Sequence, residues 1–117
     1  MFKSLFSIIF ILVSSLSFAN EVNIYTSRHY DSDDQLYEDF RKETGIKINV
    51  ISGNGNALLE RLKSEGKNSP ADIFFTVDAG NLWKIQKEGY FQSISSSKAL
   101  SIVPMNLRGP NNEWIAI

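Results

Sequence analysis

Apolar and polar residues alternate along the chain in segments that predict strands. Residues 21–26 (EVNIYT) alternate as one strand, and residues 46–52 (IKINVIS) form a second, β-branched strand. Residues 71–77 (ADIFFTV) are almost continuously apolar, which is typical of a central parallel strand covered on both faces. A further apolar strand starts at residues 114–117, after a turn at residues 109–112.

Helical patterns separate these strands. We expect one helix to begin at a cap at Asp31 or Ser32 and to end at Gly45, and a second to be capped by Asn56 and to end at Gly66. The helical residues expected to face the core are Leu36, Tyr37, Phe40, Leu58, Leu59, Leu62, Leu82, Trp83 and Ile85.

A third helix is expected between a cap at Asp78 and Gly89, and a short one between Ser97 and Ile102. This β-α-β-α-β-α order predicts an α/β fold with a mostly parallel sheet flanked by helices. Parallel strands would bring the loops 27–31, 52–56 and 77–81 to the same edge of the sheet.

The two ends of the chain carry separate signals. Lys3, an apolar run over residues 5–16 and the small-residue stretch 17–19 predict a signal peptide over residues 1–19. The run is too short for a membrane span, so we expect export to the periplasm rather than anchoring. Residues 20–117 form one small domain, and the unfinished apolar end predicts that it is the truncated front of a longer polypeptide.

Composition narrows the function classes. Without Lys3 the mature chain has 11 basic residues against 13 acidic ones, and no basic patch is present, so nucleic acid is not an expected partner. The chain has no cysteine and one histidine. We therefore find no nucleophile, base and orienting group that would indicate an enzyme.

The candidate binding residues lie in the segment Ser27-Arg28-His29-Tyr30-Asp31. Here a strand is expected to stop and a helix to begin. His29 and Tyr30 both carry atoms that bind metals, at a place where α/β sheets hold ligands. A histidine beside a tyrosine is more often structural, and residues alone leave that alternative open.

Other candidates have structural explanations. Tyr25 lies in a strand, Tyr37 in a helical apolar stripe and Tyr90 beside Phe91, so we do not expect them to be ligands. The Gly53-Asn54-Gly55 turn could offer backbone N–H groups to an anion, or could simply be a tight turn.

Several segments together resemble the start of periplasmic ferric-iron-binding proteins, the solute-binding components of ABC-type iron importers. They are EVNIYTSRHYDSD, RKETGIKINVISG, ALLERLKSEGKNSPADIFFTVDAGNLW and VPMNLRGPNNEW. The resemblance covers the mature chain but only about the first third of such a protein. It implies the N-terminal part of the first of two α/β lobes that close over the metal.

The resemblance also implies metal ligands. Tyr30 would supply a phenolate and His29 is a ligand in some members, while the other ligands are mainly tyrosines of the second lobe. One branch uses a carboxylate at the position that Val77 occupies here, and Asp78 lies one residue later, so the tyrosine-rich branch is favoured. Ferric iron suits such a site because it is a hard cation that prefers anionic oxygen.

The expected function is therefore that of a monomeric periplasmic Fe(III)-binding component that delivers iron to an ABC permease in the inner membrane. Iron would bind alone or with a synergistic anion, and Arg28 could balance charge or hold that anion. The alternatives are a solute-binding protein for an oxyanion or other small solute, and an inactive truncated remnant.

Overall fold

The computed structural model describes residues 20–117, so the predicted signal peptide over residues 1–19 lies outside the described residues. The elements are β1 (Glu21–Thr26), α1 (Asp31–Thr44), β2 (Lys47–Ser52), α2 (Gly55–Glu65), the 3-10 turn η1 (Gly66–Asn68), β3 (Ile73–Phe75), α3 (Ala79–Lys87), α4 (Ser97–Ile102) and the 3-10 turn η2 (Met105–Leu107). Between residues 20 and 117, no helix is long and apolar enough to cross a membrane.

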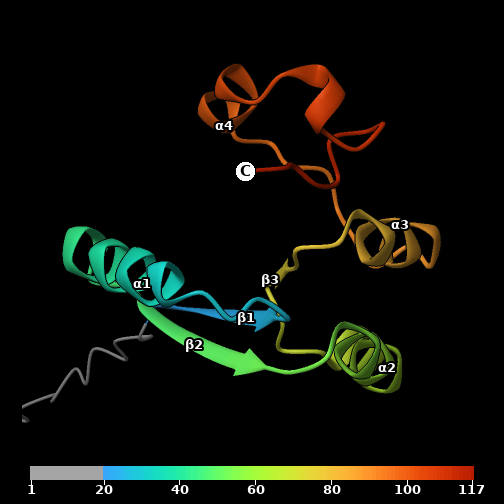
Figure 1. The fold of residues 1–117 in the computed structure, drawn as a ribbon, viewed down its shortest axis with the longest axis horizontal. Helices are drawn as coiled ribbons and strands as arrows, with labels where there is room; N and C mark the ends of the chain where they lie inside the picture. Colours follow the sequence, from blue (N-terminus) through green and yellow to red (C-terminus); the bar gives the residue numbers. More distant parts are fainter. Residues whose placement is uncertain (1–19) are drawn as a thin grey trace, which may run out of the picture.

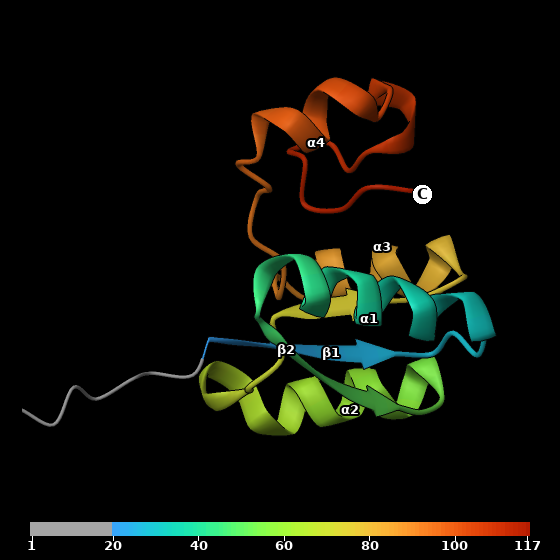
Figure 2. The same cartoon turned by 90° about the vertical axis from the view of Figure 1, so that its left-hand side faces the viewer.

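The sheet is parallel, with strand order β2-β1-β3. Tyr25 in the central strand β1 is paired with Ile51 on one side and Phe74 on the other. Helix α1 lies on one side of the sheet and α2 on the other, and the turned view shows the same layering (Figures 1 and 2). The predicted α/β fold with a parallel sheet flanked by helices is confirmed.

The core forms where α2 covers the sheet. Leu58 and Leu62 recur at helical spacing and pack with the fully buried Tyr25. Three partly buried residues, Ile51, Ala71 and Phe74, pack against this cluster. The predicted inner face of α2 is therefore confirmed.

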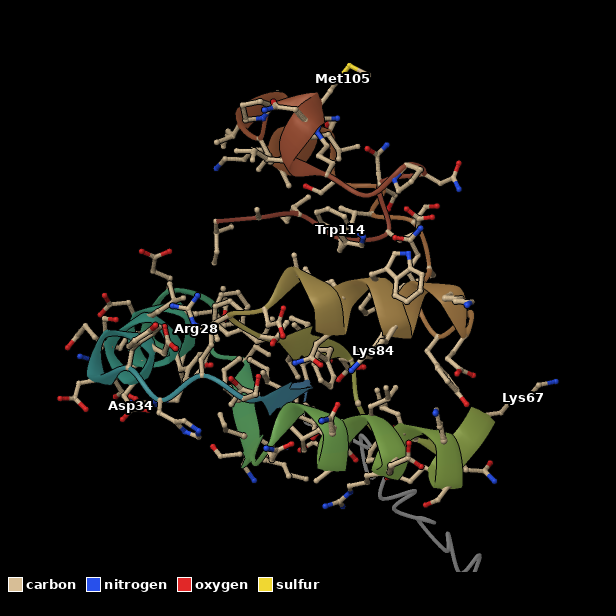
Figure 3. All side chains as sticks on the ribbon, turned by 45° about the vertical axis from the view of Figure 1, so that its right-hand side comes forward. Arg28, Asp34, Lys67, Lys84, Met105 and Trp114 are labelled. Atoms are coloured by element: carbon tan, nitrogen blue, oxygen red, sulfur yellow. The ribbon has the colours of Figure 1, made fainter. Side chains whose placement is uncertain are left out.

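Helix α3 runs beside α2 beyond the β3 edge of the sheet. Lys84 Nζ lies 3.3 Å from Asn56 Oδ1, and Lys63 Nζ lies 3.5 Å from Glu88 Oε1. Figure 3 shows Lys84 directed from α3 toward α2. These polar contacts join the two helices that follow β2 and β3.

The prediction of a long central strand at residues 71–77 was wrong. β3 has three residues and is an edge strand of the sheet, and its Ile73 side chain is 48% exposed. Side chains end the strand on both sides: Asp72 accepts a hydrogen bond from the Asn23 backbone N–H (2.8 Å), and Thr76 Oγ1 accepts one from the Asp78 backbone N–H (3.3 Å). An apolar run alone does not distinguish a central strand from an edge strand.

The predicted inner faces of α1 and α3 were partly wrong. On α1, Tyr37 is half-buried as expected, but Leu36 and Phe40 are 53% and 38% exposed, and the buried residue of the helix is Asp33. On α3, Ile85 is fully buried as expected, but Trp83 is 58% exposed and its ring contacts Lys87 Nζ at 5.0 Å. On both helices the apolar positions cover more of the helix surface than the fold buries.

Two helix caps also differ from the prediction. Tyr30, not Asp31 or Ser32, is the N-cap of α1, and it makes no side-chain cap bond. Asn54, not Asn56, caps α2: its Oδ1 accepts from the Asn56 backbone N–H at 2.9 Å. The caps at Asp78 and the helix end at Gly45 (φ 71°) are confirmed.

The last segment, with α4 and η2, lies apart from the sheet (Figures 1 and 2). The predicted helix at Ser97–Ile102 and the turn at residues 109–112 are confirmed, the turn by the hydrogen bond from Asn112 N to Gly109 O (3.0 Å). The strand expected at residues 114–117 is reduced to a single antiparallel bridge between Ile115 and Arg108. The Trp114 indole N–H donates to Gln86 Oε1 at 2.7 Å, which ties this segment to α3.

Candidate functional site

Three loops meet at the carboxyl edge of the sheet. The Ser27 backbone N–H donates to Phe75 O (2.9 Å), and the Gly53 backbone N–H donates to Thr26 O (3.1 Å). The Ser27 and Thr76 hydroxyl groups lie 2.9 Å apart. The prediction that loops 27–31, 52–56 and 77–81 share one edge is confirmed, because parallel strands end on the same side.

Tyr30 lies at the carboxyl edge of the sheet, directly before α1. Its backbone is extended (φ −100°, ψ 132°) because it precedes the first residue of α1, and its side chain is 56% exposed. It lines a pocket of about 480 Å³ together with Arg28, Phe75, Asp78 and Trp114, among others. A phenol here can reach a solute in the pocket.

His29 has a different environment. Its side chain is exposed, and it is not among the residues that line this pocket. Within residues 20–117, no three His, Asp or Glu side chains come together as a metal-binding group. Tyr30 and His29 could therefore supply only some of the ligands that a metal ion needs. Their role as ligands stays a prediction.

Arg28 is held by a charged partner across the start of α1. Its Nε and Nη2 atoms donate to Asp33 Oδ2 (2.9 Å) and Oδ1 (2.8 Å), and both side chains are largely buried. Such a two-pronged pair is stronger and more directional than a single hydrogen bond. The fork that could have taken an anion is occupied by Asp33, which leaves charge balance as the role that the geometry favours.

The Arg28 guanidinium also contacts two aromatic rings. Its Cζ atom lies 4.1 Å from the centroid of the Phe75 ring and 5.1 Å from that of the Tyr30 ring. Figure 3 shows Arg28 between the start of α1 and the ribbon that leads into α3. The cation therefore connects β3 to the candidate ligand.

Two other tyrosines are poor sources of a phenolate. The Tyr25 hydroxyl donates to Glu65, and burial, followed by this bond to a carboxylate, raises the pKa of Tyr25. Burial also raises the pKa of Tyr37, and the negative charge of Asp33 adds to the effect. Among the described residues, the buried Tyr37 hydroxyl makes no hydrogen bond of ordinary geometry, although the nearby Thr26 side chain partly opposes the rise in its pKa.

Tyr90 lines a larger cavity of about 870 Å³ between β3 and the C-terminal segment. Its neighbours there include Phe91 and Ile94. This cavity adjoins the pocket at Tyr30, with which it shares Phe75 and Trp114, but Arg28 and Tyr30 do not line it. The pocket at the carboxyl edge is the better candidate.

Comparison with known proteins supports a common architecture. The family model described as "Bacterial extracellular solute-binding protein" matches residues 26–116. The chain belongs to the bacterial extracellular solute-binding protein family. Among the relatives, "Iron uptake protein A1" of Synechocystis is 50% identical over 94 residues, which are 80% of this chain and 26% of that protein.

Solved structures of solute-binding proteins superpose well on the chain. A Trichodesmium protein (IdiA, FutA) in complex with iron and citrate gives a TM-score of 0.78 at 54% identity, covering 82% of this chain and 30% of that one. A ferric binding protein from Campylobacter jejuni gives 0.80 at 41% identity, covering 82% and 30%. The chain thus spans between a quarter and a third of the length of these solute-binding proteins.

Sequence reasoning missed two residues of this edge. Neither Asp33 nor Phe75 is singled out by the sequence patterns above. A signal for Asp33 exists, because it carries the charge opposite to that of Arg28 and lies five residues after it, across the start of a helix. Phe75 approaches only through the sheet pairing with Thr26.

Proposed function

We propose that residues 20–117 form the N-terminal part of the first lobe of a periplasmic Fe(III)-binding protein, which delivers iron to an inner-membrane ABC permease. The chain carries out no bond-making chemistry in this role. The observation that carries the proposal is the exposed Tyr30 side chain on the wall of the carboxyl-edge pocket. The named relatives, which include an iron uptake protein and a complex with iron and citrate, support the same cargo.

In this proposal Tyr30 binds iron as a phenolate. A bound trivalent cation can displace the phenolic proton at neutral pH, and ferric iron prefers such anionic oxygen ligands. His29, next along the loop, supplies a ring nitrogen directly or hydrogen-bonds to the ligand sphere. The carboxylates of Asp31 and Asp34, in the first turn of α1, add negative charge near the ion.

One phenol and one imidazole fill only part of an octahedral shell. The other positions would be taken by water, by a synergistic anion such as citrate, or by residues of a longer polypeptide. The isolated chain should therefore bind iron weakly, and tight specific binding by residues 20–117 alone would contradict this account. The inactive remnant is the limiting case in which no binding occurs.

The proposal is tested with ferric citrate added to the purified chain and followed by NMR. High-spin Fe(III) broadens the signals of nearby nuclei, so even weak binding should broaden the amides of residues 28–31 first. The diamagnetic gallium citrate serves as a control, and a visible phenolate-to-iron band gives a second reading. Tyr30→Phe should remove both effects and Tyr90→Phe should not; broadening centred elsewhere would refute the site.

An oxyanion cargo is the alternative. It has less support at this edge because Asp33 already occupies two of the donor nitrogens of Arg28. Calorimetry with phosphate, sulfate and ferric citrate separates the two functions, since only the iron complex should give a heat that depends on Tyr30.

A further inference from the structure

Tyr30 is an exposed side chain, and exposed tyrosines ordinarily exchange between rotamers. A metal ligand that must be ordered on each binding event loses affinity through that ordering. The structure around Tyr30 contains an arrangement that restricts this freedom. The arrangement consists of Arg28, Asp33 and Phe75. None of these three residues has to contact the solute itself.

The first part of the arrangement is a closed loop through Asp33. The Asp33 carboxylate receives the two hydrogen bonds from Arg28, and the Asp33 backbone N–H donates to Tyr30 O at 3.0 Å. The Arg28 backbone N–H in turn donates to Thr26 Oγ1 at 3.0 Å. Asp33 therefore holds residues on both sides of His29, Arg28 through its carboxylate and Tyr30 through its backbone N–H.

The second part is the contact between the cation and the rings. The planar guanidinium, already oriented by Asp33, lies near both the Phe75 and the Tyr30 rings, at 4.1 and 5.1 Å from their centroids. Phe75 belongs to β3 and is fixed by pairing with Thr26 of β1. Through Arg28, the position of the sheet therefore constrains the Tyr30 ring by a cation–π contact.

We propose that Arg28 is a positioning residue that, locked by Asp33 and seated against Phe75, holds the Tyr30 ring so that its hydroxyl faces the pocket. The inference rests on the proposed function, because it assigns the purpose of the fixed ring to iron capture. Because Asp33 neutralises its charge locally, Arg28 can stand beside the site without strongly repelling a trivalent cation.

Lysine cannot replace arginine in this role. An ammonium keeps the charge but lacks the planar fork that binds both carboxylate oxygens and stacks on rings. Arg28→Lys and Asp33→Asn should therefore both release the Tyr30 ring. Arg41→Lys is the matched control. Arg41 forms an exposed ion pair with Glu38 on α1 and, within residues 20–117, makes no cation–π contact with an aromatic ring.

The experiment has two readings on the full chain. Without metal, side-chain NMR couplings and ring shifts of Tyr30, assigned with Tyr30→Phe, should indicate one rotamer in the wild type and averaging in Arg28→Lys and Asp33→Asn. With ferric citrate, the same two variants should bind iron about tenfold more weakly, as is typical when the residues behind a metal ligand are changed. Urea unfolding of each variant separates a loss of positioning from a loss of fold.

The outcomes distinguish the two proposals. If wild-type iron binding depends on Tyr30 but Arg28→Lys leaves both the Tyr30 rotamer and the affinity unchanged, Arg28 has no positioning role while the iron site stands. If Arg41→Lys weakens binding equally, the effect is one of general charge and the inference fails. If the wild type gives no Tyr30-dependent iron signal, the proposed function fails and the positioning role fails with it.

Discussion

The hydroxyl group of the buried Tyr25 lies 2.7 and 2.9 Å from the two carboxylate oxygens of Glu65, across the main core cluster. This bond ties the central strand β1 to the end of α2. Arg61 completes the arrangement: its Nε pairs with Glu65 at 3.3 Å, and its Cζ lies 5.2 Å from the centroid of the Tyr25 ring.

Tyr25→Phe should therefore destabilise the fold. The substitution keeps the ring but removes a hydrogen bond to a charged acceptor, which is typically worth about 1.5–3 kcal/mol. Urea unfolding followed by circular dichroism measures the change. Tyr90→Phe, at a 39% exposed tyrosine, is the matched control and should change the free energy of unfolding by less than about 0.5 kcal/mol.

Tyr37→Phe should have the opposite sign. The Tyr37 hydroxyl is buried without a partner among residues 20–117, so the fold bears its desolvation cost without a compensating bond. Its removal should leave the free energy of unfolding unchanged or raise it by up to about 1 kcal/mol. A clear loss of stability in the same urea experiment would show that the hydroxyl does have a partner in solution.

Alkaline pH should weaken the fold through the same two tyrosines. Tyr25 and Tyr37 both have pKa values raised above the ordinary 10.0, mainly by burial. Below pH 10 the folded and unfolded chains both keep these protons, so stability is unaffected. As the pH rises above 10 the unfolded chain loses them first, and stability falls until the pH reaches the raised pKa values.

The measurement is the urea midpoint at a series of pH values from about 8 to about 11. In Tyr25→Phe/Tyr37→Phe the decline above pH 10 should be shallower than in the wild type. If the urea midpoint falls equally in both proteins, other titrating groups cause the loss of stability.

Gly55 marks the closest approach of α2 to α3. A Cβ atom added there would lie 2.4 Å from Asn81 Nδ2, which is too close unless the Asn81 side chain moves. Because the Asn81 amide is the free end of a side chain and can turn away, Gly55→Ala should cost about 1 kcal/mol, the low end for overpacking. In Gly55→Ala/Asn81→Ala the clash is absent, so most of the loss should be recovered; a strictly additive double variant would contradict this contact.

The alternation of strands and helices could be predicted because it rests on local patterns. Val22 and Ile24 alternate with polar residues, and Leu58 and Leu62 recur one helical turn apart, so the order of strands and helices along the chain and the α2 core follow from residues close in sequence. The common edge of the three loops then follows from parallel pairing alone.

The errors arise where the apolar pattern does not say which helical positions the fold covers. Leu36 is exposed although it lies one turn from the buried Asp33, on the same face of α1. Trp83 is likewise exposed on α3. Phe75 was not predicted at the site because it reaches Arg28, 47 residues away in the sequence, only through the pairing of β3 with β1.

His29 and Tyr30 should contribute unequally to iron binding. Tyr30 lines the carboxyl-edge pocket, whereas the exposed His29 does not, so the phenolate is the better-placed ligand. Tyr30→Phe should remove the iron-dependent NMR broadening, and His29→Ala should only reduce it. Both are surface changes and should alter the free energy of unfolding by less than about 0.5 kcal/mol, so affinity and stability are separable. Ferric citrate titrations of the two variants measure the difference, and a larger loss in His29→Ala than in Tyr30→Phe would make the imidazole the principal ligand.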